Sequence, residues 1–148
     1  MFMKKIILLL SLILMEFGAF SQVSSFDSRL YARFSEEDLL EIQRNNPIDI
    51  EYKNWFVENA FVIKEIENPE SSNYPKLKYF DKETKLDGAE VNEYNPETFN
   101  VLECSYELLA KSSNVYRLGN TGKIIVFYSR EDLTKLFNEY RRAHNENN

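Results

Sequence analysis

The 148-residue sequence contains a single histidine and a single cysteine, and both scarcities exclude classes of function. The histidine, His144, stands near the end of the chain. Catalytic triads, Cys/His dyads and most zinc sites need well-placed imidazole or thiolate groups, so we expect none of them here. The cysteine, Cys104, has no second cysteine to pair with. We expect it to be a small, buried apolar side chain, with an intermolecular disulfide as the alternative.

The sequence also lacks a basic patch and a phosphate-binding loop. Its formal net charge is -6, and the lysines between Lys76 and Lys85 are interleaved with acidic residues, which indicates a solvated surface. Nucleic acids and anionic membranes select clustered Lys and Arg, so we expect neither as a partner. Gly119 and Gly122 form a Gly-x-x-Gly segment, but no Lys-Ser/Thr pair follows it, and a turn is the better interpretation.

Acidic residues around Asp87-Gly88 resemble a calcium loop only at first sight. In the alignment that places Asp87 at the fifth loop position, Lys85 and Tyr94 stand where oxygen ligands are required. We interpret the segment as a charged loop, with a looser calcium site as the alternative. We therefore predict no metal and no cofactor.

Residues 1–21 have the pattern of a cleavable secretory signal peptide. Two lysines precede the apolar run Ile6–Met15, and Ala19 and Ser21 are small residues at positions -3 and -1 of a cleavage before Gln22. The run is much shorter than the roughly 20 apolar residues that span a membrane, although an uncleaved anchor is the alternative. We expect an exported, periplasmic or secreted domain over residues 22–148, without a transmembrane span after leader removal.

Capping patterns predict three helices. Ser35 followed by Asp38 begins the first, which Asn45, Asn46 and Pro47 stop. The second begins with Asn46 as its cap and Pro47 at its first position. The third follows Ser129 and Asp132, and its apolar face recurs at helical spacing; that face consists of Leu133, Leu136, Phe137 and Tyr140. We expect the polar tail 144–148 to fray.

Runs rich in β-branched residues predict strands between these helices. One covers Phe61–Ile66, and two more form a hairpin, 115–118 and 123–128, about the Gly119–Gly122 turn. A further strand is expected over 99–104, and a short strand or packed flap around residues 77–80. The sequence thus predicts a single α+β domain with two N-terminal helices, a small antiparallel sheet centred on the hairpin, and a C-terminal helix packed on it.

The candidate binding residues are aromatic side chains in the polar, proline-containing middle of the chain. They are Tyr74, Tyr79, Phe80 and Tyr94. Aromatic side chains are enriched where proteins bind partners, but they also fix loops to a core. Acidic residues are too numerous for any pair to stand out as catalytic, and we predict no catalytic residue.

Two stretches, Phe26–Pro47 and above all the segment YRLGNTGKIIVFYS from Tyr116 to Ser129, resemble a family of short exported proteins of Bacteroidota whose function is uncharacterised. The resemblance implies export, and it implies no activity, cofactor or catalytic residue.

Together these observations favour a non-catalytic interaction or accessory protein of the cell envelope or the medium, whose partner is another envelope protein or a glycan. The alternatives are a small carboxylate-dependent hydrolase of wall or glycan polymers and a glycan-binding module without turnover.

Overall fold

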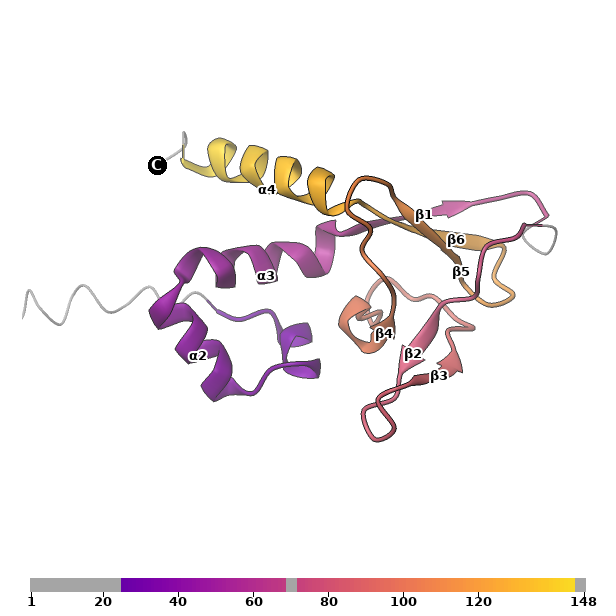
Figure 1. Ribbon diagram of the computed structural model, residues 1–148, viewed down its shortest axis with the longest axis horizontal. Helices are drawn as coiled ribbons and strands as arrows, with labels where there is room; N and C mark the ends of the chain where they lie inside the picture. The colour runs from indigo at the N-terminus through magenta and orange to yellow at the C-terminus, as the bar shows by residue number, and fades with distance from the viewer. Residues whose placement is uncertain (1–24, 69–71, 146–148) are drawn as a thin grey trace, which may run out of the picture.

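The computed structural model describes residues 25–68 and 72–145, so the predicted leader lies outside the described residues. The helices gather at one end of the molecule and the strands at the other (Figure 1). The α+β class is confirmed. The elements are η2 (Ser28–Ala32, 3-10), α2 (Glu36–Asn45), α3 (Pro47–Asn59), β1 (Phe61–Glu65), β2 (Lys78–Phe80), β3 (Asp87–Glu90), η4 (Val101–Glu103, 3-10), β4 (Cys104–Ser105), β5 (Asn114–Arg117), β6 (Lys123–Phe127) and α4 (Arg130–Asn145).

The two N-terminal helices begin where the capping pattern predicts. The Ser35 hydroxyl accepts the Asp38 N–H at 3.1 Å, and the Asp38 carboxylate accepts the Ser35 N–H at 3.0 Å, which completes a capping box. α3 begins at Pro47 with Asn46 at the N-cap position, but the Asn46 side chain makes no capping hydrogen bond. Proline has no backbone N–H, so the first position of α3 leaves one fewer hydrogen-bond donor for a cap to satisfy.

The first sheet has the antiparallel order β1-β6-β5 and contains the predicted hairpin. Its register sets Phe61 opposite Phe127 and Tyr116 opposite Ile125. Gly119 and Gly122 close the hairpin with φ angles of 48° and 74°, a left-handed geometry that glycine adopts without steric cost.

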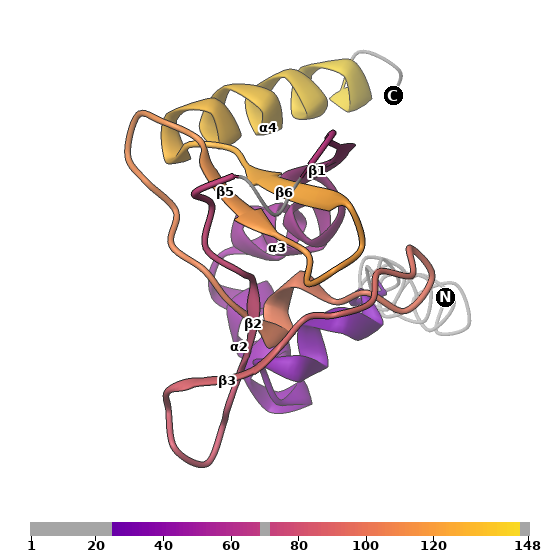
Figure 2. The same ribbon diagram turned by 90° about the vertical axis from the view of Figure 1, so that its right-hand side faces the viewer.

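A second sheet, β3-β2-β4, lies below the first (Figures 1 and 2). The expected strand around residues 77–80 exists as β2, whereas β3 was not predicted. The strand predicted over 99–104 is wrong for residues 99–103, of which 101–103 form the 3-10 helix η4; only Cys104 belongs to a strand, β4. The reason is local, because the Asn100 side chain accepts the Leu102 N–H at 3.0 Å and caps a helical turn there.

The segment before β2 ties the two sheets together. Lys76 forms a parallel bridge with Arg117 of β5, where the Leu77 N–H donates to the Arg117 carbonyl at 2.8 Å and the Arg117 N–H donates to the Pro75 carbonyl at 2.8 Å. Leu77 is fully buried between them. The Arg117 end of the outer edge of β5 is therefore occupied by the chain itself.

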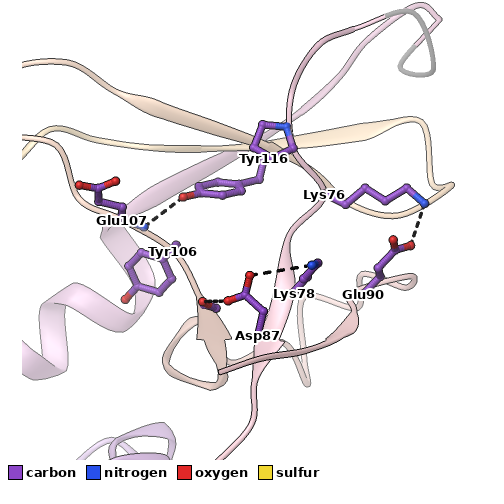
Figure 3. A pocket seen from close by; sticks show the side chains of 9 residues that line it. Lys76, Lys78, Asp87, Glu90, Tyr106, Glu107 and Tyr116 are labelled. Carbon is purple, nitrogen blue, oxygen red and sulfur yellow. Dashed lines mark hydrogen bonds and ion pairs between the residues drawn. The ribbon is translucent and has the colours of Figure 1, made fainter. Parts of the chain in front are cut away.

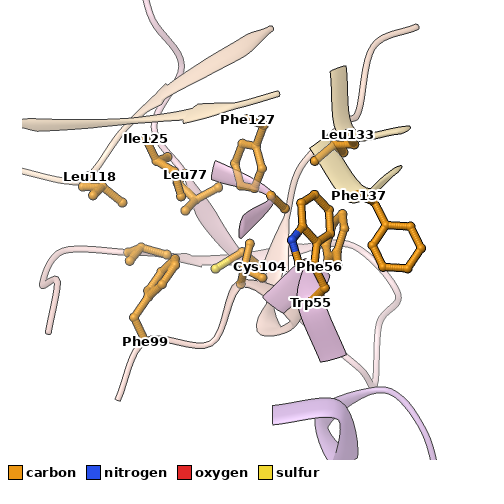
Figure 4. Close-up of a cluster of buried hydrophobic side chains, with 13 residues drawn as sticks. Trp55, Phe56, Leu77, Phe99, Cys104, Leu118, Ile125, Phe127, Leu133 and Phe137 are labelled. Atoms are coloured by element: carbon orange, nitrogen blue, oxygen red, sulfur yellow. The ribbon is translucent and has the colours of Figure 1, made fainter. Parts of the chain in front are cut away.

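The main core joins both sheets to α3 and α4 (Figure 4). Its buried side chains include Trp55, Phe56, Leu77, Phe99, Cys104, Leu118, Ile125, Phe127, Leu133 and Phe137. A smaller cluster, Leu30, Leu39, Ile50 and Val57, holds η2 and α2 against α3. Burying a large apolar side chain stabilises a fold by roughly 1.5–3 kcal/mol, so these clusters fix the relative positions of helices and sheets.

The C-terminal helix α4 follows a capped start, as predicted. Ser129 accepts the Asp132 N–H at 3.0 Å, and Leu133 and Phe137 are the buried residues of the helix. The Phe137 ring lies 5.1 Å from Tyr52 and 5.4 Å from Trp55 between centroids, so α4 contacts α3 as well as the core beneath the first sheet. The helix continues through Asn145, beyond the point at which we expected fraying, and residues 146–148 lie outside the described part.

Candidate functional site

One candidate site is a groove between the two sheets, with a cavity volume of about 520 Å³ (Figure 3). We call it the inter-sheet groove. Its lining residues come from β2, β3, β4 and β5 and from the segments beside them: Pro75, Lys76, Lys78, Asp87, Glu90, Ser105, Tyr106, Glu107 and Tyr116. The Lys76–Arg117 bridge closes the groove at one end because it joins the second sheet to β5.

The charged groups of the groove are arranged in pairs. Lys76 Nζ lies 2.7 Å from Glu90 Oε2, and Lys78 Nζ lies 3.9 Å from Asp87 Oδ2. The Ser105 hydroxyl donates to the second oxygen of Asp87 at 2.5 Å. These side chains are about a third to a half exposed, so water screens the ion pairs and each contributes little to stability. A polar ligand can therefore exchange with them at small cost.

Two tyrosines form the opposite wall. The Tyr116 hydroxyl accepts hydrogen bonds from the Glu107 N–H at 3.1 Å and from Asn114 Nδ2 at 3.0 Å. With its acceptor capacity used, this hydroxyl offers its proton to a ligand. The Tyr106 ring stacks on Phe127 with centroids 4.2 Å apart and planes 9° apart. Burial raises the pKa of Tyr106 to about 12, so this side chain is neutral at physiological pH.

The four predicted binding residues do not form a single surface, and all four lie in the described part of the chain. Tyr74 and Tyr79 are exposed, at 42% and 40%. Phe80 lies under the Arg33 guanidinium, whose carbon is 4.3 Å from the ring centroid. The Tyr94 ring packs against the Phe99 ring, with the two ring centroids 5.2 Å apart. No ring contact joins any two of the four.

Tyr79 and Tyr94 line separate hollows away from the inter-sheet groove. The Tyr79 hollow includes Glu93 and Glu103. Burial raises the pKa of Tyr79, and the nearby Cys104, Glu103 and Glu93 raise it further. The aromatic walls of the groove are instead Tyr106 and Tyr116, which the sequence did not single out.

The charged residues of the groove were interpreted from the sequence as a solvated surface. That interpretation missed their pairing, because Lys76 and Lys78 meet Glu90 and Asp87 only when β2 and β3 lie side by side. The sequence feature that could have indicated β2 is the alternation of Lys76 and Lys78 about the apolar Leu77, a pattern typical of a half-buried strand. Gly88 and the charged residues around it give the partner strand β3 no strand pattern of its own.

The reactive side chains that remain lie outside the groove. Cys104 is buried, as predicted, and burial raises the pKa of its thiol to about 12. His144 is on the last turn of α4, with Nδ1 2.9 Å from the Tyr140 carbonyl oxygen. Across the described residues, no group of three or more His, Cys, Asp or Glu side chains is placed to hold a metal ion.

No helix within the described ranges is long and apolar enough to cross a membrane. No protein-family model, no curated protein and no solved structure matches the chain. The function must therefore be inferred from the chemistry of the protein's own surfaces.

Proposed function

We propose that this chain is a non-catalytic, exported interaction protein of the cell envelope or the medium, and that the inter-sheet groove binds its partner. The observation that carries the proposal is the lining of the groove, where two cations, three carboxylates and two tyrosines surround a cavity of about 520 Å³. Sites that bind small polar ligands combine a concave shape with a few convergent polar groups. Export follows from the leader pattern of residues 1–21.

The chemistry around the groove supports binding over turnover. Near-neutral proton transfer most often uses histidine, and the only histidine, His144, is on α4 and does not line the groove. Ser105 is the one hydroxyl nucleophile there besides the tyrosines, and its proton is directed to Asp87. Serine nucleophiles are usually activated by an adjacent histidine or amine, not by a carboxylate alone.

The partner that suits this lining is another envelope protein or a glycan. Ion pairs such as Lys76–Glu90 present both donors and acceptors at the surface, and a sugar hydroxyl or a peptide amide uses both. The Tyr116 hydroxyl adds a donor, and the Tyr106 ring adds an apolar wall. Aromatic and polar groups in this combination are typical of partner-binding surfaces.

A carboxylate-dependent hydrolase is the second candidate, because Asp87, Glu90 and Glu107 line the same groove. Glycoside hydrolysis requires two carboxyl groups on either side of the scissile bond. This candidate predicts release of reducing ends from wall or glycan polymers by the purified protein. It also predicts that Asp87→Asn or Glu90→Gln abolishes the release.

The test is mild cross-linking in native envelopes, followed by recovery of the protein and its partner. We expect one partner to be recovered with the unaltered protein and lost with the groove double variant Lys76→Met/Glu90→Leu. Lys135→Met/Glu131→Leu removes an equivalent ion pair on α4 and is the matched control, which should retain the partner. Recovery of free monomer alone, or equal recovery with both double variants, would contradict the proposal. Polymer cleavage that depends on Asp87 would replace it with the hydrolase.

A further inference from the structure

Strand β1 leaves one edge of the first sheet open. Its inner side bonds to β6, and the bonds at its two ends are Tyr128 N–H to the Ala60 carbonyl at 3.0 Å and Ile66 N–H to the Gly122 carbonyl at 3.1 Å. Bonded residues alternate along an antiparallel pair, so the even-numbered residues 60–66 face β6. The residues whose N–H and C=O groups point outward are Phe61, Ile63 and Glu65.

No other described segment bonds to these outward groups. Natural proteins usually protect such an edge with proline, a bulge or a covering segment. The edge of β5 is covered in this way at its Arg117 end by residues 75–77. In contrast, β1 has five consecutive regular pairs and no proline, so it has the form of a strand ready to accept a partner.

Two hollows flank this edge, one on each face of the sheet. The larger has a volume of about 580 Å³ and lies between β1 and α4, and its charged lining residues are Glu58 and Glu139. The smaller has a volume of about 280 Å³, lies beside Phe61 and Ile63, and is lined by Arg29 as well as by Glu58. An added strand would direct its side chains alternately to these two faces.

We infer that the strand accepted here is β1 of a second copy of this chain, antiparallel about a two-fold axis at Ile63. This register sets Ile63 opposite its own copy, Phe61 opposite Glu65, and Val62 opposite Lys64. Every outward backbone group is then paired, and the surface is self-complementary, as a closed two-fold dimer requires. A two-fold axis at Lys64 would instead oppose two lysines directly, which destabilises a strand pair.

The charge on one face fits this occupant. Side chains directly opposite in an antiparallel pair lie on the same face, about 4.5–5.5 Å apart at Cβ. Lys64 of the second copy thus lies beside Val62, which lines the larger hollow together with Glu58 and Glu139. Trp55 and Tyr140 line the same hollow, and aromatic rings attract an ammonium group.

The hollow on the other face has charges of both signs, Arg29 and Glu58. Glu65 of the second copy lies beside Phe61, which lines the smaller hollow with Arg29. Arg29 already pairs with Asp27 at 2.7 Å and Glu58 at 2.9 Å, and its guanidinium has further donors to offer. In this register the charge that finds opposite charge is Lys64, which meets Glu58 and Glu139. This inference does not depend on the inter-sheet groove.

The test begins with the oligomeric state of the protein, expressed with its own leader and studied by sedimentation equilibrium over a range of concentrations. We expect a monomer–dimer equilibrium. Glu65→Pro removes an outward N–H at an exposed position without removing a bond to β6. It should weaken dimerisation by at least about tenfold with an unchanged circular dichroism spectrum. Glu65→Gln keeps the N–H, and we expect a loss of less than about tenfold.

Charge exchange tests the register. Lys64→Glu and Glu139→Lys should each weaken the dimer, and the double variant Lys64→Glu/Glu139→Lys should restore it. Ile63→Cys should form a disulfide-linked dimer under mild oxidation, because the Cα atoms of a bonded pair lie about 5.5 Å apart. Leu86→Cys, at a position that is 68% exposed on the other sheet, is the control and should cross-link far more slowly.

Three results would overturn the inference. The first is a monomer at every concentration, including the case in which the monomer binds a lysine-containing extended peptide at β1 instead. The second is a dimer that Glu65→Pro leaves unchanged. The third is cross-linking of Ile63→Cys that is no faster than that of Leu86→Cys. A failure of the envelope cross-linking experiment at the groove would leave all three measurements unaffected.

Discussion

Tyr106 stacks flat on Phe127, with centroids 4.2 Å apart and planes 9° apart. Phe127 is the last residue of β6 and is fully buried, whereas Tyr106 follows β4 of the other sheet and lines the inter-sheet groove. The stack thus joins the core of the first sheet to the wall of the candidate site. Changes to this pair should affect stability and binding together.

We expect Tyr106→Ala to lower the free energy of unfolding by about 2–4 kcal/mol, since it removes a large buried ring and an aromatic pair. Tyr106→Phe keeps the ring and should cost less than about 1.5 kcal/mol. Urea unfolding followed by Trp55 fluorescence measures both values. Equal losses for the two variants would show that the hydroxyl, and not the stack, stabilises this wall.

The hairpin glycines offer a matched pair of substitutions. A Cβ on Gly119 would lie 2.5 Å from Asn92 Oδ1 and 2.9 Å from the Val91 carbonyl oxygen, whereas a Cβ on Gly122 would meet nothing within 4 Å. Gly122→Ala should cost about 1–2 kcal/mol from its positive φ alone. Gly119→Ala carries the same strain and a clash, so thermal unfolding should show a clearly larger loss. A smaller loss at Gly119 would contradict the packing of residues 91–92 on the turn.

Helix capping predicts a graded loss of stability. Ser129 is only 1% exposed and bonds both the N–H and the carboxylate of Asp132, whereas Ser35 caps α2 at the surface. Each serine-to-alanine change should cost about 0.5–2 kcal/mol, with Ser129→Ala at the upper end. Ser112→Ala, at an exposed loop position, is the control and should lie within about 0.5 kcal/mol of the unaltered protein. Chemical denaturation distinguishes the three.

Acid should destabilise the fold through Asp27. Hydrogen bonds from the Arg29 side chain hold the pKa of Asp27 below its ordinary value. A lowered pKa in the folded state adds stability that is present above the unfolded value of 3.8 and is lost as pH falls through the folded value. The melting temperature should therefore decline below about pH 4. Asp27→Asn should flatten that decline, and Glu41→Gln, which removes an exposed carboxylate on α2, should not.

Alkali should act through Cys104 and Tyr106. Burial raises the pKa of each to about 12 in the folded state. Stability from a raised pKa is complete below the unfolded values, 9.0 and 10.0, and is lost as pH rises toward the folded ones. Unfolding should therefore become easier above about pH 9. Cys104 should react with a thiol reagent at pH 8 only at the rate of unfolding, and rapid reaction of the native protein would contradict its burial.

Local signals explain why much of the fold could be predicted. Ser35 and Ser129 cap helices through partners three residues away, and Gly119 and Gly122 close a hairpin between adjacent strands. These structures depend on neighbouring residues, so their sequence patterns are direct. The second sheet is different, because β2 must pair with β3 and with β4 through short and irregular contacts. Cys104–Ser105 has no strand pattern of its own.

The candidate site could not be predicted for the same reason. The sequence indicates the four aromatic candidates only by their place in a polar segment. In the fold, Phe80 lies under the Arg33 guanidinium and Tyr94 packs against Phe99. The groove is formed where separate strands meet, and Tyr106 reaches it from the end of β4. Lys76 and Glu90 are 14 residues apart, and they meet only because β2 and β3 pair side by side.

The bridge between Lys76 and Arg117 also bears on how far any assembly could grow. By blocking the Arg117 end of the outer edge of β5, it makes β1 the more open side of that sheet among the described residues. A sheet with two open sides can add copies without end and form fibres, whereas a sheet with one open side closes after a single addition. We therefore expect that deleting the bridge, and not strengthening β1, would convert this chain into one that polymerises.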